Sequence, residues 1–365
     1  MNENIILAKQ NITNIVKDYG APYFYVNATK DYKNILSFGL NGEKEATGNE
    51  KVFLFSCTKL ITVITTMACV EKGLLSLEDK AYQYLPFIKE CFYINEKGEK
   101  EIIGERITIR HLLTMSAGFS YNIYNSDFLA FLKSNHNANN YEVIKEFCKM
   151  PLLFAPGEKF NYSFCHDVLS AIVEVVQNKP YSECVNEAII KPLGLKDTHF
   201  QHDSNGLIDL YMEENDSIKK MSINGNPYLL SKNFYGGGAG LVGTANDYIK
   251  IGTALANGGR SEDGTQIISE GTLKLIRTPQ IEKAFTTAQG NDYLYGLGVR
   301  TRTKETPWGL PVGEYGWDGA AGSFIMIDPV NKTSVFVCMH VRNWMGFRGK
   351  HIEIVREIYE HILNK

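Results

Sequence analysis

The chain has 365 residues, of which 44% are hydrophobic and 22% are charged. These proportions are typical of a globular protein with a sizeable core, and they argue against a disordered chain. The formal net charge of −3 gives no electrostatic reason to expect nucleic acid or an anionic membrane surface as a principal partner.

The sequence also bears on the compartment of the protein. The longest apolar run, Leu60–Val70, stops at Glu71 and is too short to span a bilayer. The N-terminal residues lack the basic start, apolar stretch and cleavage site of a secretory signal. Seven cysteines without CxxC spacing argue against a disulfide framework or a structural zinc site. We therefore expect a cytoplasmic protein with reduced thiols and no membrane partner.

The first half of the chain begins with a predicted helix and a hairpin and then becomes mainly helical. Helical periodicity covers Glu3–Lys17 and ends near a Gly-Ala-Pro stop. The alternating segments Tyr23–Asn27 and Tyr32–Gly39 then predict a hairpin. A helical pattern returns over Ser56–Lys72, and the region from Glu78 to Tyr235 is mainly helical, with Gly and Pro stops between its helices. These helices are predicted at Thr108–Met115, Tyr141–Lys149, His166–Gln177 and Pro180–Ile190.

The second half of the chain returns to strands. One helix is predicted at Ala245–Asn257, three strands at Tyr295–Arg300, Gly322–Ile327 and Thr333–His340, and an amphipathic terminal helix at Gly349–Leu363. Strands at both ends with helices between them predict an α+β fold, in which an antiparallel sheet flanked by helices carries an inserted, mainly helical lobe. We expect a single domain over 1–365, with sub-lobes at 1–77 plus 236–365 and at 78–235.

Ser56 and Lys59 are three residues apart at the start of a predicted helix and therefore share one of its faces. A serine hydroxyl needs a neighbouring base, and a lysine amine can serve if burial lowers its pKa. The signal is weak alone, because Ser56 could be a helix N-cap and Lys59 a surface charge. A second SxxK pattern, Ser217–Lys220, lies in a polar stretch that we interpret as a solvated loop.

Several further motifs resemble, in the same order, those of the serine β-lactamase-like hydrolases, which include class C β-lactamases, D-alanyl-D-alanine peptidases and esterases. They are FLFSCTK at 53–59, ITIRHLLTMSAG at 107–118, PGEKFNYS at 156–163, PLGLKDT at 192–198 and GGAGL at 237–241. The resemblance covers nearly the whole chain and implies a β-lactamase/DD-peptidase-like fold. It also implies that Tyr162 faces Ser56 and Lys59 as the second proton-transfer group.

Two motifs depart from the pattern of the family's peptidases and β-lactamases. Many members carry Asn two residues after the tyrosine, but this chain has Phe164, so recognition of a substrate amide there is lost or supplied elsewhere. The motif GWDGAAG at 316–322 is similar to the version in the family's carboxylesterases, whereas the peptidases usually carry Lys-Thr-Gly.

The GWDGAAG motif implies further site residues. By the resemblance, Gly319 lets the backbone approach the substrate, and the N–H groups of Ser56 and Ala320 form an oxyanion hole. Trp317 offers an apolar wall. Asp318 is interpreted as a local hydrogen-bonding residue, or as a residue of the site rim.

Two other signals are not assigned to function. The sequence GAGLVG at 238–243 spells GxGxxG, but no buried parallel strand precedes it, so a dinucleotide site is not expected. Asp167 is interpreted as a local hydrogen-bonding residue.

We expect a serine hydrolase that forms an acyl-enzyme on Ser56 and acts on small carboxylic esters, with no cofactor or metal. One alternative is a β-lactamase or D-alanyl-D-alanine carboxypeptidase, in which Arg342, Arg348 or Lys350 would anchor a carboxylate. Another is a non-catalytic ligand-binding sensor. The expected partner is a small-molecule ester or amide, and the sequence indicates neither the physiological substrate nor an oligomeric state.

Overall fold

The computed structural model describes residues 3–222, 225–281 and 292–364. The chain separates into two compact units, and each is described by itself. The first unit comprises Met1–Cys57, Ile190–Gly225 and Leu241–Lys365, and the second comprises Thr58–Ile189 and Asn226–Gly240. The sequence-based boundaries at 77 and 235 differ from this division, because periodicity locates helices and strands without showing which of them pack together.

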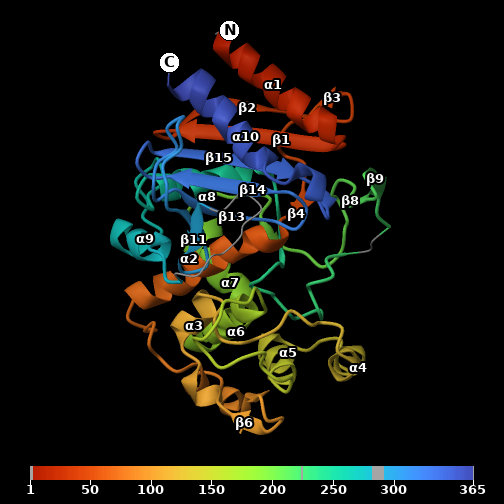
Figure 1. The fold of residues 1–365 in the computed structure, drawn as a ribbon, viewed down its shortest axis with the longest axis vertical. Helices are drawn as coiled ribbons and strands as arrows, with labels where there is room; N and C mark the ends of the chain where they lie inside the picture. The colour runs from red at the N-terminus through yellow and green to blue at the C-terminus, as the bar shows by residue number, and fades with distance from the viewer. Residues whose placement is uncertain (1–2, 223–224, 282–291, 365) are drawn as a thin grey trace. The chain divides into compact units, whose positions relative to one another are not determined.

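The centre of the first unit is an eight-stranded antiparallel sheet (Figure 1). Its strands are β1 (Tyr23–Lys30), β2 (Lys33–Asn41), β3 (Lys44–Glu45), β11 (Tyr293–Tyr295), β12 (Arg300–Arg302), β13 (Tyr315–Asp318), β14 (Phe324–Asp328) and β15 (Thr333–Met339). Their spatial order is β11-β12-β13-β14-β15-β1-β2-β3. The N-terminal hairpin therefore pairs with the last long strand, with Val26 opposite Val337. This confirms the expectation that the two ends of the chain build one sheet.

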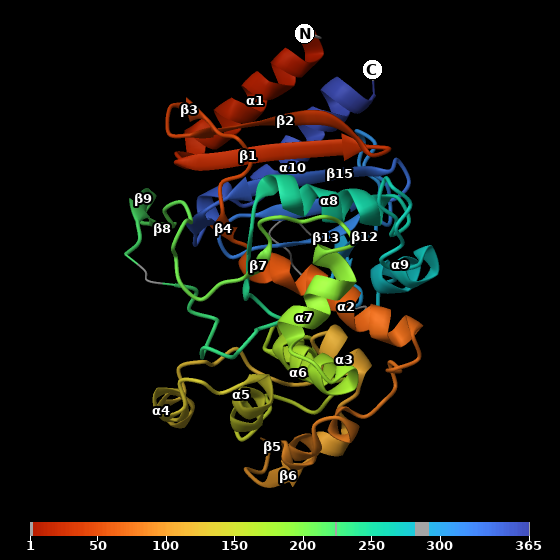
Figure 2. The same cartoon turned by 180° about the vertical axis from the view of Figure 1, so that it is seen from behind.

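Helices cover both faces of this sheet. They are α1 (Glu3–Tyr19), α8 (Ala245–Ala256) and α10 (Lys350–Ile358), with α9 (Glu270–Arg277) elsewhere in the same unit. Successive side chains of β15 point to opposite faces. Val337 belongs to the core that includes α1 and α10 (Figure 1). Phe336 stacks on Tyr248, with ring centroids 4.5 Å apart. Tyr248 belongs to α8, which covers the face of the sheet that Figure 2 shows. Burial on both faces explains why β15 is apolar along most of its length.

Two small sheets complete the first unit. One contains β4 (Val52–Phe53), β7 (His199–Phe200) and β10 (Leu241–Gly243), and the other contains β8 (Tyr211–Glu214), β9 (Ser217–Lys220) and β16 (Val341–Arg342). Strand β10, which begins inside the GAGLVG segment, is antiparallel to both of its neighbours. A dinucleotide-binding fingerprint belongs to a parallel βαβ unit, so this pairing does not fit a dinucleotide site at 238–243. The second SxxK pattern forms β9 and is not a loop, although Ser217 is exposed.

The second unit is mainly helical, as expected. Its helices are α2 (Thr58–Glu71), α3 (Ile109–Leu113), α4 (Ser126–Ser134), α5 (Asn140–Phe147), α6 (Cys165–Gln177) and α7 (Tyr181–Val185), and it includes a hairpin of β5 (Phe92–Ile94) and β6 (Lys100–Ile102). Helix α6 contacts α2, α3, α5 and α7, so it forms the centre of this unit. Helix α2 is buried from Thr58 to Cys69, which accounts for its almost continuous apolar and threonine-rich sequence.

One predicted strand is wrong. The segment Tyr295–Arg300 is not a continuous strand, because β11 ends at its first residue and β12 begins at its last. The intervening turn is closed by a hydrogen bond of 2.8 Å from the Gly296 N–H to the Val299 carbonyl, and Gly298 has a φ of +80°. Glycine adopts this backbone conformation readily, so Gly296 and Gly298 are a sequence signal for a turn. The alternating apolar residues around them led to the wrong prediction of a strand.

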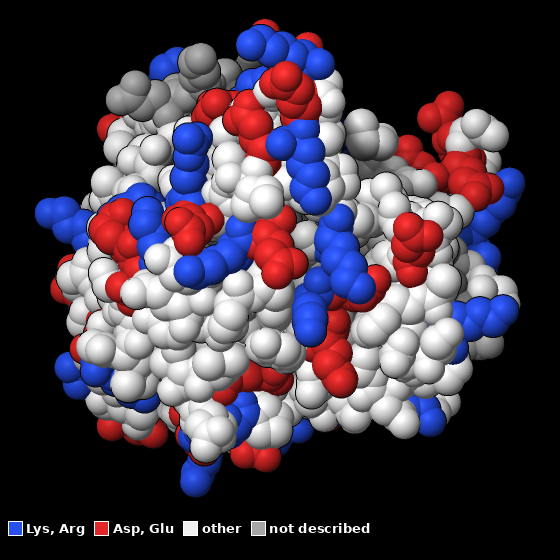
Figure 3. Space-filling model, turned by 90° about the horizontal axis from the view of Figure 1, so that it is seen from below, with Lys and Arg blue, Asp and Glu red and all other residues white. Residues whose placement is uncertain are grey.

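The surface shows no large field of one charge on the face drawn in Figure 3, where acidic and basic side chains are interspersed. This distribution is in keeping with the small net charge of the chain. Within the described ranges, no helix combines the length and the apolar character that a membrane crossing requires.

Candidate active site

Ser56 follows β4 in a tight turn of the first unit. The preceding residue, Phe55, has a φ of +44°, a conformation that costs a bulky side chain roughly 1–3 kcal/mol. The turn is fixed from the other side, because the Tyr248 hydroxyl donates a hydrogen bond of 2.7 Å to the Cys57 carbonyl. Phe55 and Cys57 are buried, and Ser56 between them is half-exposed. The turn therefore presents the serine while its neighbours anchor the backbone.

The end of β13 contacts this serine turn within the same unit. A Cβ atom on Gly319 would lie 2.6 Å from the Leu54 carbonyl oxygen, so only glycine permits the close approach. The Gly319 N–H donates to the Ser323 carbonyl at 2.7 Å and closes the turn that carries Ala320. Ala320 is half-exposed, and its N–H has no hydrogen-bond acceptor among the described residues. The two predicted oxyanion donors, Ser56 and Ala320, thus lie on backbone turns that touch.

The residues before Gly319 are largely committed to contacts within the sheet. The Trp317 side chain is 8% exposed, and its ring meets Tyr295 edge to face at 5.3 Å. Asp318 forms an ion pair of 2.9 Å with Arg300, which is fully buried. Asp318 is therefore not only a local hydrogen-bonding residue, because it pairs with an arginine on the neighbouring strand β12. The Arg300 guanidinium neutralises its charge. Strand β13 presents no cation at the position where the family's peptidases usually carry lysine.

In the second unit, the Lys59 amine is fully buried near the start of α2. Its Nζ donates to the Gly238 carbonyl at 2.7 Å and to the Tyr121 hydroxyl at 3.3 Å. The same nitrogen lies 4.7 Å from the centre of the Tyr162 ring. The Gly238 peptide is in turn held by Asp167, whose Oδ1 accepts its N–H at 3.0 Å. The structure therefore brings Lys59 and Tyr162 together and restricts the amine to one place.

Tyr162 lies in the loop that precedes α6, and the segment after α3 holds that loop. The N–H of Asn161 donates to the Met115 carbonyl at 2.9 Å, and Met115 itself has a φ of +55°. The Tyr162 ring stacks on Tyr121 at 5.7 Å between centroids, with 16° between the planes. The TIRHLLT motif and the residues that follow it thus position the tyrosine.

The predicted site residues form two groups, each within its own unit. The first group contains Ser56, Trp317, Gly319 and Ala320, and the second contains Lys59 and Tyr162. The chain itself links the groups, because Lys59 follows Ser56 by three residues at the junction between the two units.

A comparison with known families shows which family the chain belongs to. The family model described as Beta-lactamase matches residues 8–360. The chain belongs to the beta-lactamase family. The solved structure of EstCE1, described as a hydrolase with promiscuous acyltransferase activity, has the same fold with a TM-score of 0.80. It is 21% identical, and the match covers 98% of this chain and 99% of EstCE1.

Relatives of this beta-lactamase family member carry names of two activity classes. A lovastatin esterase from Penicillium rubens is 31% identical over 238 residues, which are 60% of this chain and 59% of the esterase. A putative D-alanyl-D-alanine carboxypeptidase from Escherichia coli is 27% identical over 323 residues, which are 80% of this chain and 69% of the relative. The similarity therefore extends to an esterase and to a protein named as a peptidase.

At position 164, where many beta-lactamase family members carry Asn, this chain has a core residue. Phe164 is 1% exposed and stacks on Phe147 with ring centroids 4.6 Å apart. Its ring also meets Tyr121 at 5.2 Å. A buried amide would need polar partners at this place, whereas the phenyl ring only needs apolar contact. Phe164 thus supports, through Tyr121, the aromatic pair that contacts the Lys59 amine.

Sequence reasoning missed two residues of this site. Tyr121 contacts Lys59, but no spacing rule marks it. Asp167 was interpreted as a local hydrogen-bonding residue, but its partner Gly238 is 71 positions away. A Cβ atom on Gly238 would lie 2.3 Å from Asp167 Oδ2, which shows how closely the carboxylate and this peptide are packed. The signal that could have indicated Asp167 is its position on α6, five residues after Tyr162.

The buried carboxyl group of Asp167 leads to a prediction on pH. Burial raises its pKa from 3.8 to about 6, although the Lys59 charge acts in the opposite direction. Because the pKa is higher in the folded than in the unfolded chain, the stabilising contribution of this carboxyl is complete below about pH 4 and is lost as the pH rises through about 6. We expect wild type to lose, relative to Asp167→Asn, on the order of 3 kcal/mol of unfolding free energy between pH 4 and pH 7.

Denaturant unfolding of both proteins at the two pH values measures this difference. Glu174, whose pKa burial raises to about 7, titrates in both proteins and cancels from the comparison. An equal stability difference between the two proteins at pH 4 and pH 7 would contradict the prediction.

Proposed function

We propose that this protein is a serine hydrolase that forms an acyl-enzyme on Ser56 and hydrolyses small carboxylic esters. The observation that carries the proposal is the buried Lys59 amine, which contacts the Gly238 carbonyl and the Tyr162 ring. Lys59 is three residues after Ser56, which is half-exposed on a constrained turn. Acyl transfer on a serine requires groups that can move its proton, and an amine and a phenol are groups of this kind.

The proposed reaction proceeds in two steps. The Ser56 oxygen attacks the ester carbonyl, and its proton passes to Lys59 and Tyr162, which act together as the base. The N–H groups of Ser56 and Ala320 stabilise the tetrahedral oxyanion, and each donor contributes about 3–4 kcal/mol. The proton then passes to the departing alkoxide, which leaves as an alcohol. In the second step, water attacks the acyl-enzyme with the same groups as base, and the carboxylic acid is released with restoration of the serine hydroxyl.

An ester substrate is favoured by two observations. The tip of β13 carries Trp317 and a neutralised Asp318, so this strand lacks the cation that would bind a peptide carboxylate. In addition, one relative at 31% identity is named as an esterase. The second candidate is a β-lactamase or D-alanyl-D-alanine carboxypeptidase, and the relative from Escherichia coli supports it. A non-catalytic sensor is the third, and the presence of Phe164 where many family members carry Asn supports it.

The cysteines support a reducing compartment. All seven are free and buried, as their odd number and spacing indicated. Free thiols persist most readily where glutathione and thioredoxin keep them reduced. We therefore propose the cytoplasm as the place of action.

Turnover and covalent labelling together test the proposed function. We expect the wild-type protein to hydrolyse p-nitrophenyl butyrate and to turn over a chromogenic cephalosporin much more slowly. A fluorophosphonate should stop the ester reaction, and peptide mass spectrometry should place its adduct on Ser56. Turnover of the cephalosporin alone would favour the β-lactamase candidate. A slow adduct on Ser56 without any turnover would favour the sensor, and an adduct on another residue would contradict all three.

A further inference from the structure

Trp344 contacts the turn that carries Ala320, within the first unit. It lies just beyond β16, and its indole Nε1 donates a hydrogen bond of 3.2 Å to the Gly319 carbonyl. The Gly322 N–H donates to the same oxygen at 3.0 Å, so two donors converge on one carbonyl. Trp344 is 25 positions from Gly319, and none of the motifs that predicted the site includes it.

The contact with Trp344 fixes the direction of the Ala320 N–H. The Gly319 carbonyl and the Ala320 N–H belong to one peptide unit, and no peptide bond of the described residues is cis. In a planar trans peptide, the C=O and the N–H point in opposite directions. Because the carbonyl oxygen is held by Trp344, the N–H points away from the indole, and it has no acceptor among the described residues. The peptide is thus oriented so that its N–H is available to a ligand.

His351 holds the other end of the same turn. Its Nε2 lies 2.8 Å from the Gly322 carbonyl, and because a carbonyl only accepts, this nitrogen carries the proton. Burial lowers the pKa of His351 to about 3, so the imidazole is neutral above that pH and donates this one N–H. The Trp344 and His351 rings meet edge to face, with centroids 4.9 Å apart. The two aromatic side chains therefore pack together, and each donates to a carbonyl of the turn.

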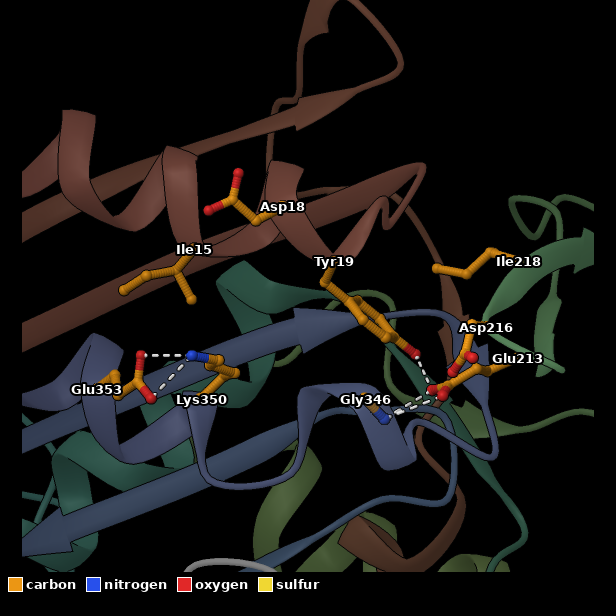
Figure 4. Close-up of a pocket in the computed structure, with 9 residues that line it drawn as sticks. All are labelled: Ile15, Asp18, Tyr19, Glu213, Asp216, Ile218, Gly346, Lys350 and Glu353. Carbon is orange, nitrogen blue, oxygen red and sulfur yellow. Dashed lines mark hydrogen bonds and ion pairs between the residues drawn. The ribbon is translucent and has the colours of Figure 1, made fainter.

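The segment that follows Trp344 is held by Glu213 of β8 (Figure 4). Both oxygens of this carboxylate accept the Gly346 N–H at 3.0 Å, and Oε2 also accepts the Tyr19 hydroxyl proton at 2.8 Å. A Cβ atom on Gly346 would lie 3.1 Å from Glu213 Oε1, which shows how closely this segment packs against the carboxylate. Strand β8 also pairs with β16, which precedes Trp344. The backbone on both sides of the indole is therefore fixed.

We propose that Trp344 is a positioning residue of the candidate active site, which orients and polarises the Ala320 N–H as a donor to the oxyanion. The inference rests on the proposed function of Ser56. A peptide whose carbonyl accepts a hydrogen bond is a better N–H donor, because hydrogen bonds in a chain polarise one another. The gain is larger for a charged oxyanion than for a neutral ester carbonyl, so Trp344 stabilises the transition state more than the bound substrate.

Replacing Trp344 with phenylalanine keeps an aromatic ring beside His351 and removes the indole N–H. We expect Trp344→Phe to lower kcat/KM for p-nitrophenyl butyrate by about 5- to 50-fold, less than the loss of a whole oxyanion donor, because the Gly322 N–H remains on the carbonyl. Propyl trifluoromethyl ketone gives a second measurement. The Ser56 oxygen adds to its carbonyl and the serine proton passes to the base, which leaves a hemiketal oxyanion. The inhibition constant of this ketone should rise by a similar factor.

Trp308→Phe is the matched control, because it removes an indole that packs against Tyr359 in the core of the first unit. This variant should keep the wild-type kcat/KM and inhibition constant. Unchanged values in a Trp344→Phe protein that thermal unfolding shows to be folded, or equal changes in Trp308→Phe, would overturn the proposal. If Trp344→Phe does not fold, Glu213→Ala replaces it, because this variant keeps the indole and releases Gly346. A wild-type kcat/KM in Glu213→Ala would then overturn the proposal.

If wild type neither hydrolyses the ester nor binds the ketone, the proposed function fails, and NMR then tests the contact of Trp344 separately. Glycine labelled with ¹³C at the carbonyl and alanine labelled with ¹⁵N select the three Gly–Ala peptides of the chain in an HNCO spectrum. They are Gly20–Ala21, Gly238–Ala239 and Gly319–Ala320. We expect Trp344→Phe to move the Gly319 carbonyl resonance upfield, because a carbonyl carbon is deshielded by the hydrogen bond that its oxygen accepts, and to leave the other two signals in place. An unchanged Gly319 resonance would overturn the positioning contact.

Discussion

Replacing Ser56 with alanine is expected to lower kcat for p-nitrophenyl butyrate by about 10⁴-fold or more. The substitution removes the oxygen that accepts the acyl group, at a residue that is half-exposed. The backbone contact that fixes the turn, from the Tyr248 hydroxyl to the Cys57 carbonyl, does not involve the serine side chain. Initial rates measure the effect, and circular dichroism and the thermal unfolding midpoint confirm that the variant is folded.

The second SxxK pattern provides a matched control for this experiment. Ser217 is exposed on β9, and the lysine of this pattern, Lys220, pairs with Asp209 at the surface rather than lying in a buried site. Ser217→Ala should therefore keep wild-type activity. Comparable losses in the two variants, or full activity in Ser56→Ala, would remove the basis for an acyl-enzyme on Ser56.

The sequence predicted those parts of the fold whose causes are local. Helix α6 begins one residue before the predicted start and ends at the predicted residue, because its apolar face is continuous and Asn178 ends it in a left-handed conformation. Strand β15 was predicted because most of its residues are apolar and Val335, Phe336 and Val337 at its centre favour strands. The segment Tyr295–Arg300 failed because the glycine turn inside it was read as part of a strand. The division into units depends on contacts between distant segments, which no local pattern contains.

The same distinction applies to the site. Ser56, Lys59 and Tyr162 were predicted because they belong to short motifs in a fixed order, and the structure places Lys59 beside Tyr162. Their supporting contacts come from remote parts of the chain. The Gly238 carbonyl is 179 positions from Lys59, and its hydrogen bond to the amine has no counterpart in sequence spacing. Phe164 is a departure that sequence could identify, but only its burial shows that it belongs to the core.

Replacing Lys59 with methionine is expected to lower kcat by about 10³- to 10⁴-fold, because general base catalysis by a positioned side chain contributes on this scale. Methionine is similar in length, and its flexible apolar chain fits a fully buried position. The variant also leaves the Gly238 carbonyl without its Lys59 hydrogen bond, which should lower the free energy of unfolding by about 1–3 kcal/mol. Steady-state kinetics and denaturant unfolding measure the two effects separately.

Two further substitutions decide what the amine does. Lys72→Met removes an exposed lysine just beyond α2 and should leave kcat unchanged. Lys59→Arg keeps the positive charge but supplies a group that does not lose its proton in proteins. If Lys59 moves the proton, the arginine variant remains as inactive as the methionine variant. If Lys59 only holds the Gly238 peptide, both Lys59 variants lose stability while kcat stays within about tenfold of wild type, because an interaction that is equal in ground and transition states does not change kcat.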